Sequence, residues 1–120
     1  SRYEVVAAEY LQKEGYRILT KNFRSRFGEI DIVAEEEPYL VFVEVKYRTK
    51  QSQGDPSEAV DYRKIRKITK TAEYYLVKKG ISMERPIRFD IVSILPDEIR
   101  LLRNAFDAAL VSPVLPFCLF

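Results

Sequence analysis

The chain has 120 residues, 47% of them apolar and 32% charged, which indicates one folded domain and excludes a disordered chain. One cysteine and no histidine exclude a disulfide framework, a four-cysteine zinc site and every mechanism that uses a histidine base. The net charge of +2 does not by itself indicate a nucleic-acid partner. We see no signal-peptide pattern and no apolar run long enough to span a membrane, so we expect a cytoplasmic protein.

The first predicted element is a helix over residues 2–14 that ends at Gly15. Glu4 lies on a line with two apolar positions of this helix, which places it at the edge of the buried face. The predicted apolar stripe consists of Tyr3, Ala7, Tyr10 and Leu11.

Three strands are predicted next, at residues 16–24, 29–34 and 39–48, with a turn at residues 35–38 between the last two. The third strand is apolar on both faces until Glu44. This pattern is typical of a strand in the middle of a sheet that is covered on both sides.

A long helix is predicted from Ser57 to Lys79, and a fourth strand at residues 87–95 follows it. Because a helical crossover joins the third and fourth strands, we expect them to run parallel. A short edge strand is predicted at residues 98–103. The order α-β-β-β-α-β predicts an α/β fold, with a mixed central sheet and helices on both faces. The buried stripe predicted for the long helix consists of Ile65, Ile68, Ala72, Tyr75 and Leu76.

The apolar segment 107–120 follows the predicted domain at residues 1–106. It is too short and too interrupted by proline to span a membrane. We expect it to pack on its own domain or on a partner subunit, which would make the protein a homodimer.

Three charged residues in the hairpin formed by residues 29–48 are candidates for a site. Glu44 and Lys46 project from one face of their strand because they are two residues apart. A four-residue turn at residues 36–39 places Asp31 opposite Glu44. Two adjacent carboxylates repel each other unless a cation lies between them, and Mg²⁺ prefers carboxylate oxygens. The alternative is an ion pair between Glu44 and Lys46 at a solvated strand end, with Asp31 as a solvated strand charge. From the residues alone both interpretations stay open.

Several segments resemble the YraN-like family of uncharacterised bacterial proteins. They are GEIDIVA (28–34), FVEVKYR (42–48), PSEAVDYRKIRKI (56–68), RFDIV (88–92) and NAF (104–106), together with Glu4 on the first helix. The resemblance covers about residues 3–106. That family is assigned to the PD-(D/E)xK nuclease superfamily and is similar to archaeal Holliday-junction resolvases. The resemblance therefore implies a restriction-endonuclease-like fold with three α/β/α layers.

The resemblance also implies roles for residues of the hairpin and the first helix. Asp31 and Glu44 would bind Mg²⁺ or Mn²⁺, and the main-chain carbonyl of Val45 would complete the site. Lys46 would be the catalytic lysine, and Glu4 the acid that such resolvases add from a helix. The chain departs from the family at two positions, with Tyr3 where members have glycine and Ile30 where the superfamily motif has proline.

Other charged residues are candidates for supporting roles. Glu29 lies two residues before Asp31 and therefore on the same face of the strand. It could stabilise Asp31 without binding the metal itself. Asp90, in the fourth strand, is expected to pair with a nearby arginine. The candidates for binding backbone phosphates of DNA are Arg24, Arg26, Arg48, Lys64 and Lys67.

The sequence thus predicts a Mg²⁺-dependent endodeoxyribonuclease that hydrolyses phosphodiester bonds in DNA, with branched DNA as a candidate substrate. The alternative is a nucleic-acid-binding protein of the same fold with weak or no activity. A third interpretation is a structural subunit whose apolar segment 107–120 docks a partner.

Overall fold

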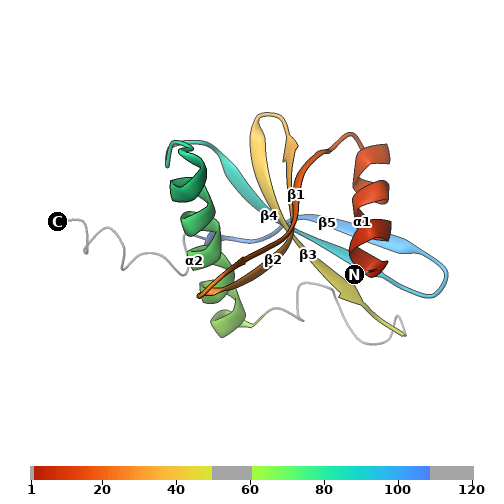
Figure 1. Cartoon of the computed structure of the whole chain (residues 1–120). Helices are drawn as coiled ribbons and strands as arrows, with labels where there is room; N and C mark the ends of the chain where they lie inside the picture. The colour runs from red at the N-terminus through yellow and green to blue at the C-terminus, as the bar shows by residue number, and fades with distance from the viewer. Residues whose placement is uncertain (1, 50–60, 109–120) are drawn as a thin grey trace.

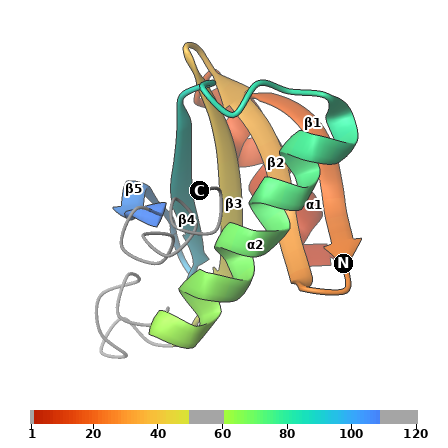
Figure 2. The same ribbon diagram turned by 90° about the vertical axis from the view of Figure 1, so that its left-hand side faces the viewer.

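The computed structural model describes residues 2–49 and 61–108, which form a mixed five-stranded sheet with one helix on each face (Figures 1 and 2). Helix α1 covers one face and helix α2 covers the other. In chain order the elements are α1 (Arg2–Lys13), β1 (Arg17–Ser25), β2 (Gly28–Glu36), β3 (Tyr39–Tyr47), α2 (Tyr62–Lys79), β4 (Ile87–Ile94) and β5 (Ile99–Phe106).

The strands lie in the sheet in sequence order, β1-β2-β3-β4-β5. Strands β3 and β4 pair in parallel, and the other three pairs are antiparallel. The predicted parallel pair is therefore confirmed, and α2 is the crossover that the parallel direction requires. The central position of β3 explains its apolar sequence, since Leu40, Val41, Phe42 and Val43 are at most 1% exposed.

Each face of the sheet has its own core. On the α2 side, Phe42, Tyr75 and Phe89 pack ring against ring, and the predicted stripe of α2 lies against them. On the α1 side, Ala7 and Leu11 pack on the apolar residues of β3 and β4. The two helices are thus held by apolar burial on opposite faces, and α1 contributes small residues that let it approach the sheet closely.

Two predicted boundaries and one predicted core residue are wrong. Helix α2 begins at Tyr62 and not at Ser57, because Asp61 is extended (φ −84°, ψ 174°) and its side chain accepts the Lys64 N–H at 2.9 Å as an N-cap. Residues 57–60 lie outside the described part of the chain. The edge strand β5 extends to Phe106, beyond the predicted end at residue 103, and adds a strand to the predicted order. Tyr3 is 40% exposed and stacks on Tyr47 instead of entering the core.

The regular alternation of β2 breaks at Asp31. Ile30 packs on the α2 side and Ile32 on the α1 side, although residues two apart in a strand normally share a face. The residue opposite Asp31 in the β1–β2 register is Asn22, whose φ of 58° is left-handed. Asparagine tolerates that conformation better than most residues. Asp31 therefore lies between a residue that packs on the α2 side and one that packs on the α1 side.

No helix within residues 2–49 and 61–108 combines the length and the apolar content needed to cross a membrane. Residues 109–120 lie outside the described residues, so the packing and dimer roles expected for this segment stay predictions.

Candidate metal centre

The candidate centre lies where β2 and β3 stop pairing. The paired positions run from Glu36–Tyr39 to Ile32–Val43, so one further step of the same register places Asp31 opposite Glu44, as predicted. Instead of a further backbone rung, Asp31 Oδ2 accepts the N–H of Val45 at 2.7 Å. The Asp31 carboxylate is therefore held against β3 by the strand itself.

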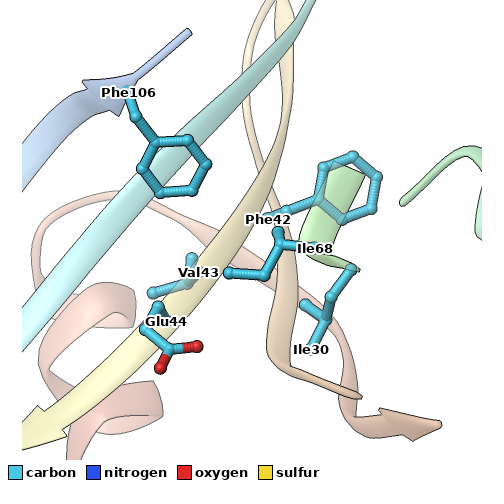
Figure 3. Close-up of a pocket in the computed structure, with 6 residues that line it drawn as sticks. All are labelled: Ile30, Phe42, Val43, Glu44, Ile68 and Phe106. Carbon is cyan, nitrogen blue, oxygen red and sulfur yellow. The ribbon is translucent and has the colours of Figure 1, made fainter. Parts of the chain in front are cut away.

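Glu44 lies at the edge of the core on the α2 side. Glu44 lines a small space together with Phe42, Ile68 and Phe106, and this space does not admit a water molecule. Figure 3 shows the side chain of Glu44 next to Val43, at one side of this group. The side chain of Glu44 is only 10% exposed. A carboxylate in such surroundings needs a cation or hydrogen-bond donors, because its desolvation is costly.

Two lysines supply positive charge to Glu44. Lys46 Nζ lies 3.3 Å from Glu44 Oε2, and Lys64 Nζ lies 2.5 Å from the same oxygen. The predicted common face of Glu44 and Lys46 is thus confirmed. Lys64 was predicted only as a phosphate-binding residue, and the structure places it beside Glu44. The crossover connection could have suggested this, because the helix that follows β3 begins near the end of that strand.

A second group of carboxylates adjoins Asp31. One carboxylate oxygen each from Glu4, Glu29 and Asp31 lie within 4.8 Å of one another. The side chain of Glu4 reaches Asn22 and Asp31 from the first turn of α1. These residues come from α1 and β2. An all-oxygen donor set of this kind fits Mg²⁺ or Mn²⁺ and does not fit a thiolate-binding metal.

Several negatively charged carboxylates lie close together in the centre. Burial raises the pKa of Asp31 to about 7, and the nearby carboxylates of Glu44, Glu4 and Glu29 add to this effect. The pKa of Lys46 is lowered by burial and by the neighbouring ammonium of Lys64. Burial alone would lower the pKa of Lys64, but its contact with Glu44 leaves that pKa raised. A divalent cation would relieve the repulsion around Asp31.

The other predicted residues lie around this centre. Arg24 pairs with Glu29 at 3.3 Å, and the guanidinium of Arg26 lies 5.0 Å from the centre of the Phe27 ring. The backbone N–H of Arg48 donates to the carbonyl of Ile94. Val45 contacts Asp31 through its N–H, and the role of its carbonyl stays a prediction.

Lys67 belongs to a basic row along the exposed side of α2. The row borders a surface hollow of about 210 Å³, and none of the residues that line the hollow is acidic. No ion pair joins these four cations to a carboxylate within the described residues. The row therefore presents positive charge to solvent and consists of Arg63, Arg66, Lys67 and Lys70.

The remaining strong charge group serves the fold. Asp90 is completely buried and accepts hydrogen bonds from Tyr16 (2.6 Å), from Arg88 (2.9 Å) and from the backbone N–H of Asn104 (2.9 Å). The predicted arginine partner of Asp90 is thus confirmed. Arg88 also pairs with Glu36, so the group ties β2, β4 and β5 to the segment that follows α1.

The similarity of this chain to other proteins agrees with the family predicted from the hairpin motifs. The family model described as uncharacterised protein family UPF0102 matches residues 3–94. A UPF0102 protein of Lachnoclostridium phytofermentans is 56% identical over 105 residues, which cover 88% of this chain and 89% of the relative. A UPF0102 protein of Persephonella marina is 52% identical over 101 residues, covering 84% and 86% of the two chains. A Clostridium botulinum relative is 43% identical over 110 residues, covering 87% and 89%. The chain therefore belongs to the uncharacterised protein family UPF0102.

Proposed function

We propose that the chain is a metal-dependent endonuclease of the PD-(D/E)xK type, with a restriction-endonuclease-like fold, that hydrolyses phosphodiester bonds in DNA. The observation that carries this proposal is the arrangement of Asp31, Glu44 and Lys46 at the point where β2 and β3 separate. Two carboxylates next to a lysine, at the edge of an otherwise apolar sheet, form a combination that metal-assisted hydrolysis uses.

Each residue of the centre has a proposed role that follows from its position. Asp31 and Glu44 would hold the ion, and Glu4 and Glu29, which adjoin Asp31, would be available as further oxygen ligands. When bound, Mg²⁺ would supply Lewis-acid chemistry, which makes a water molecule more acidic and offsets negative charge on the phosphate. Lys46, whose pKa is lowered by burial and by Lys64, positions the water and stabilises the developing negative charge. Two contacts support these roles: the Val45 N–H donates to the Asp31 carboxylate, and Lys46 pairs with Glu44.

DNA is the proposed substrate because the basic row of α2 begins next to the centre. Arg63 directly precedes Lys64, which contacts Glu44, and the row continues along the same helix. Exposed cations of this kind contact backbone phosphates and give affinity without sequence preference. Branched DNA and a homodimer formed through residues 107–120 are parts of the proposal that rest on the family resemblance.

A nucleic-acid-binding protein without useful activity is the second candidate. The observation that favours it is that Lys46 and Lys64 already neutralise Glu44 without any metal. The two candidates differ in one respect, because only the nuclease needs a divalent ion at Asp31 and Glu44.

The test combines Mg²⁺ and Mn²⁺ calorimetry with cleavage of linear and four-way-junction DNA. Glu44→Gln is compared with Glu84→Gln, a matched change at an exposed glutamate. We expect Glu44→Gln to weaken metal binding at least about tenfold and to remove cleavage, since a charged ligand is lost. Glu84→Gln should behave like the parent. Metal-independent DNA binding with no cleavage by the parent would favour the second candidate.

A further inference from the structure

We propose that Lys64 occupies the place of the divalent ion at Glu44 in the metal-free protein and moves to a phosphate of the substrate when the ion binds. This inference rests on the proposed function and concerns a residue that the nuclease motif does not include. Lys64 would then be a substrate-binding residue whose availability depends on the metal.

The contacts of Glu44 support the exchange. Both lysines reach one oxygen, Oε2, but Lys64 is the closer at 2.5 Å, against 3.3 Å for Lys46. The charge of Asp31 also acts on Lys64, although the ion pair of Lys64 is with Glu44. The ammonium of Lys64 thus lies on one of the two carboxylates proposed as metal ligands. An ion bound there would repel this ammonium and compete for the same oxygen.

The exposure of the three side chains shows which of them can leave. Glu44 is 10% exposed and Lys46 is 20% exposed, so both are enclosed by the fold. Lys64 is 39% exposed and reaches Glu44 from the solvent side. Its long side chain can therefore turn outward without disturbing the core, as lysine side chains at the rim of apolar surfaces commonly do.

The position of Lys64 on α2 indicates where it would go. The first turn of α2 contains Arg63 and Lys64, and the carboxylate at this end of the helix is that of the N-cap, Asp61. Two cations and the positive end of the helix against one carboxylate leave a net positive charge there, which a further anion would stabilise. In the metal-free protein Lys64 pairs with the Glu44 carboxylate. Once Glu44 binds the metal, a phosphate oxygen next to the ion would replace the Glu44 carboxylate as the partner of Lys64.

A permanent structural ion pair would behave differently. If Lys64 served only to neutralise Glu44, it would stay in place, and its accessibility to solvent would not depend on the ion. The exchange predicts that the ion releases the Lys64 ammonium to solvent, and that removing Lys64, as a competitor of the ion, tightens metal binding.

The first experiment measures the reactivity of each lysine to reductive methylation, with and without Mg²⁺ or Mn²⁺, by peptide mass spectrometry. We expect the ion to raise the methylation rate of Lys64 by about two- to fivefold, the size expected for release from a partly exposed ion pair. Lys67 and Lys70, on the same helix and without an ion pair among the described residues, should not change and serve as internal controls. An unchanged Lys64 rate under saturating metal would overturn the inference.

The second experiment compares Mg²⁺ affinity, by calorimetry, in Lys64→Met and in the matched variant Lys78→Met, at the other end of α2. Lys64→Met should tighten the dissociation constant by about fivefold, and Lys78→Met should leave it near the parental value. Equal or weaker binding by Lys64→Met would reject the exchange while leaving the proposed metal centre intact. If neither the parent nor Lys64→Met binds metal, the inference and the metal centre proposed here both fail.

Discussion

The backbone N–H of Val45 donates to Oδ2 of Asp31 at 2.7 Å, at the position where the next rung of the β2–β3 ladder would lie. At this position the acceptor of the Val45 N–H is thus a side-chain oxygen and not a backbone carbonyl. The backbone of the sheet therefore fixes the orientation of the Asp31 carboxylate. A carboxylate held in this way loses less conformational freedom when it binds a ligand than one on a flexible loop would.

Asp31→Asn should change how stability depends on pH in the metal-free protein. The pKa of Asp31 is raised from 3.8 to about 7, so the stability that Asp31 contributes is fully present below about pH 4 and is lost as pH rises through 7. Asparagine removes this loss and can still accept the Val45 N–H. Above pH 7 we expect the variant to be more stable than the parent by on the order of 2 kcal/mol, after allowing for solvent access.

Urea unfolding at several pH values, in the presence of a chelator, measures this difference. Asp97→Asn, at an exposed aspartate, is the control and should shift nothing. A constant difference between Asp31→Asn and the parent from pH 4 to pH 8 would contradict the assigned environment of Asp31.

Lys46→Met should separate metal binding from cleavage. Methionine keeps the apolar stem of the side chain but removes the charge near the reacting phosphate, so cleavage should fall by about 100-fold or more. Metal affinity should stay the same or improve, because one positive charge beside Glu44 is lost. Single-turnover cleavage and calorimetry measure the two properties, with Lys78→Met at the far end of α2 as the control. Parental cleavage by Lys46→Met would show that Lys46 is not catalytic.

Alanine substitutions in the basic row of α2 should lower DNA affinity without affecting metal binding. Each lost phosphate contact should reduce the slope of log affinity against log salt by about 1. Arg63→Ala and Lys67→Ala are the test variants, because both line the surface hollow, and Lys79→Ala is the control at the other end of the helix. Fluorescence anisotropy at several salt concentrations measures the slope. If all three variants keep the parental slope, the row does not contact DNA.

Asp90→Asn should destabilise the fold and leave the metal centre unchanged. Asp90 is 0% exposed, and its loss of charge leaves Arg88 facing the core with a weaker partner. We expect a decrease of about 3 kcal/mol in the free energy of unfolding, typical of a broken buried pair. Urea unfolding measures the decrease, and calorimetry at a temperature where the variant is folded should give the parental Mg²⁺ affinity.

Much of the fold could be predicted because local patterns determined it. The alternation in β2 and β3 and the short turn between them fix one register, and a helical crossover fixes the parallel direction of β4. The pairing of Glu44 with Lys46 followed from the same alternation.

Other features depend on how elements meet in space. Lys64 reaches Glu44 from the first turn of α2, whose N-cap is Asp61, so this contact depends on how the helix lies on the sheet. Glu29 and Asp31 share a face by alternation, but Glu4 joins them from another element, α1. Strand periodicity does not reveal such a contact between elements, which is why Glu4 could be anticipated only through family resemblance.

Helix α1 contributes to two charge groups at once. Glu4, in its first turn, belongs to the candidate centre, and Tyr16, just after its end, belongs to the buried group around Asp90. The two groups are also neighbours in the sheet, because Asp90 lies opposite Val43, the residue before Glu44. Changes in the free energy of unfolding from substitutions in the two groups should therefore be coupled and not simply additive. A site variant consequently reports on the candidate centre most directly when the residues around Asp90 are left unchanged.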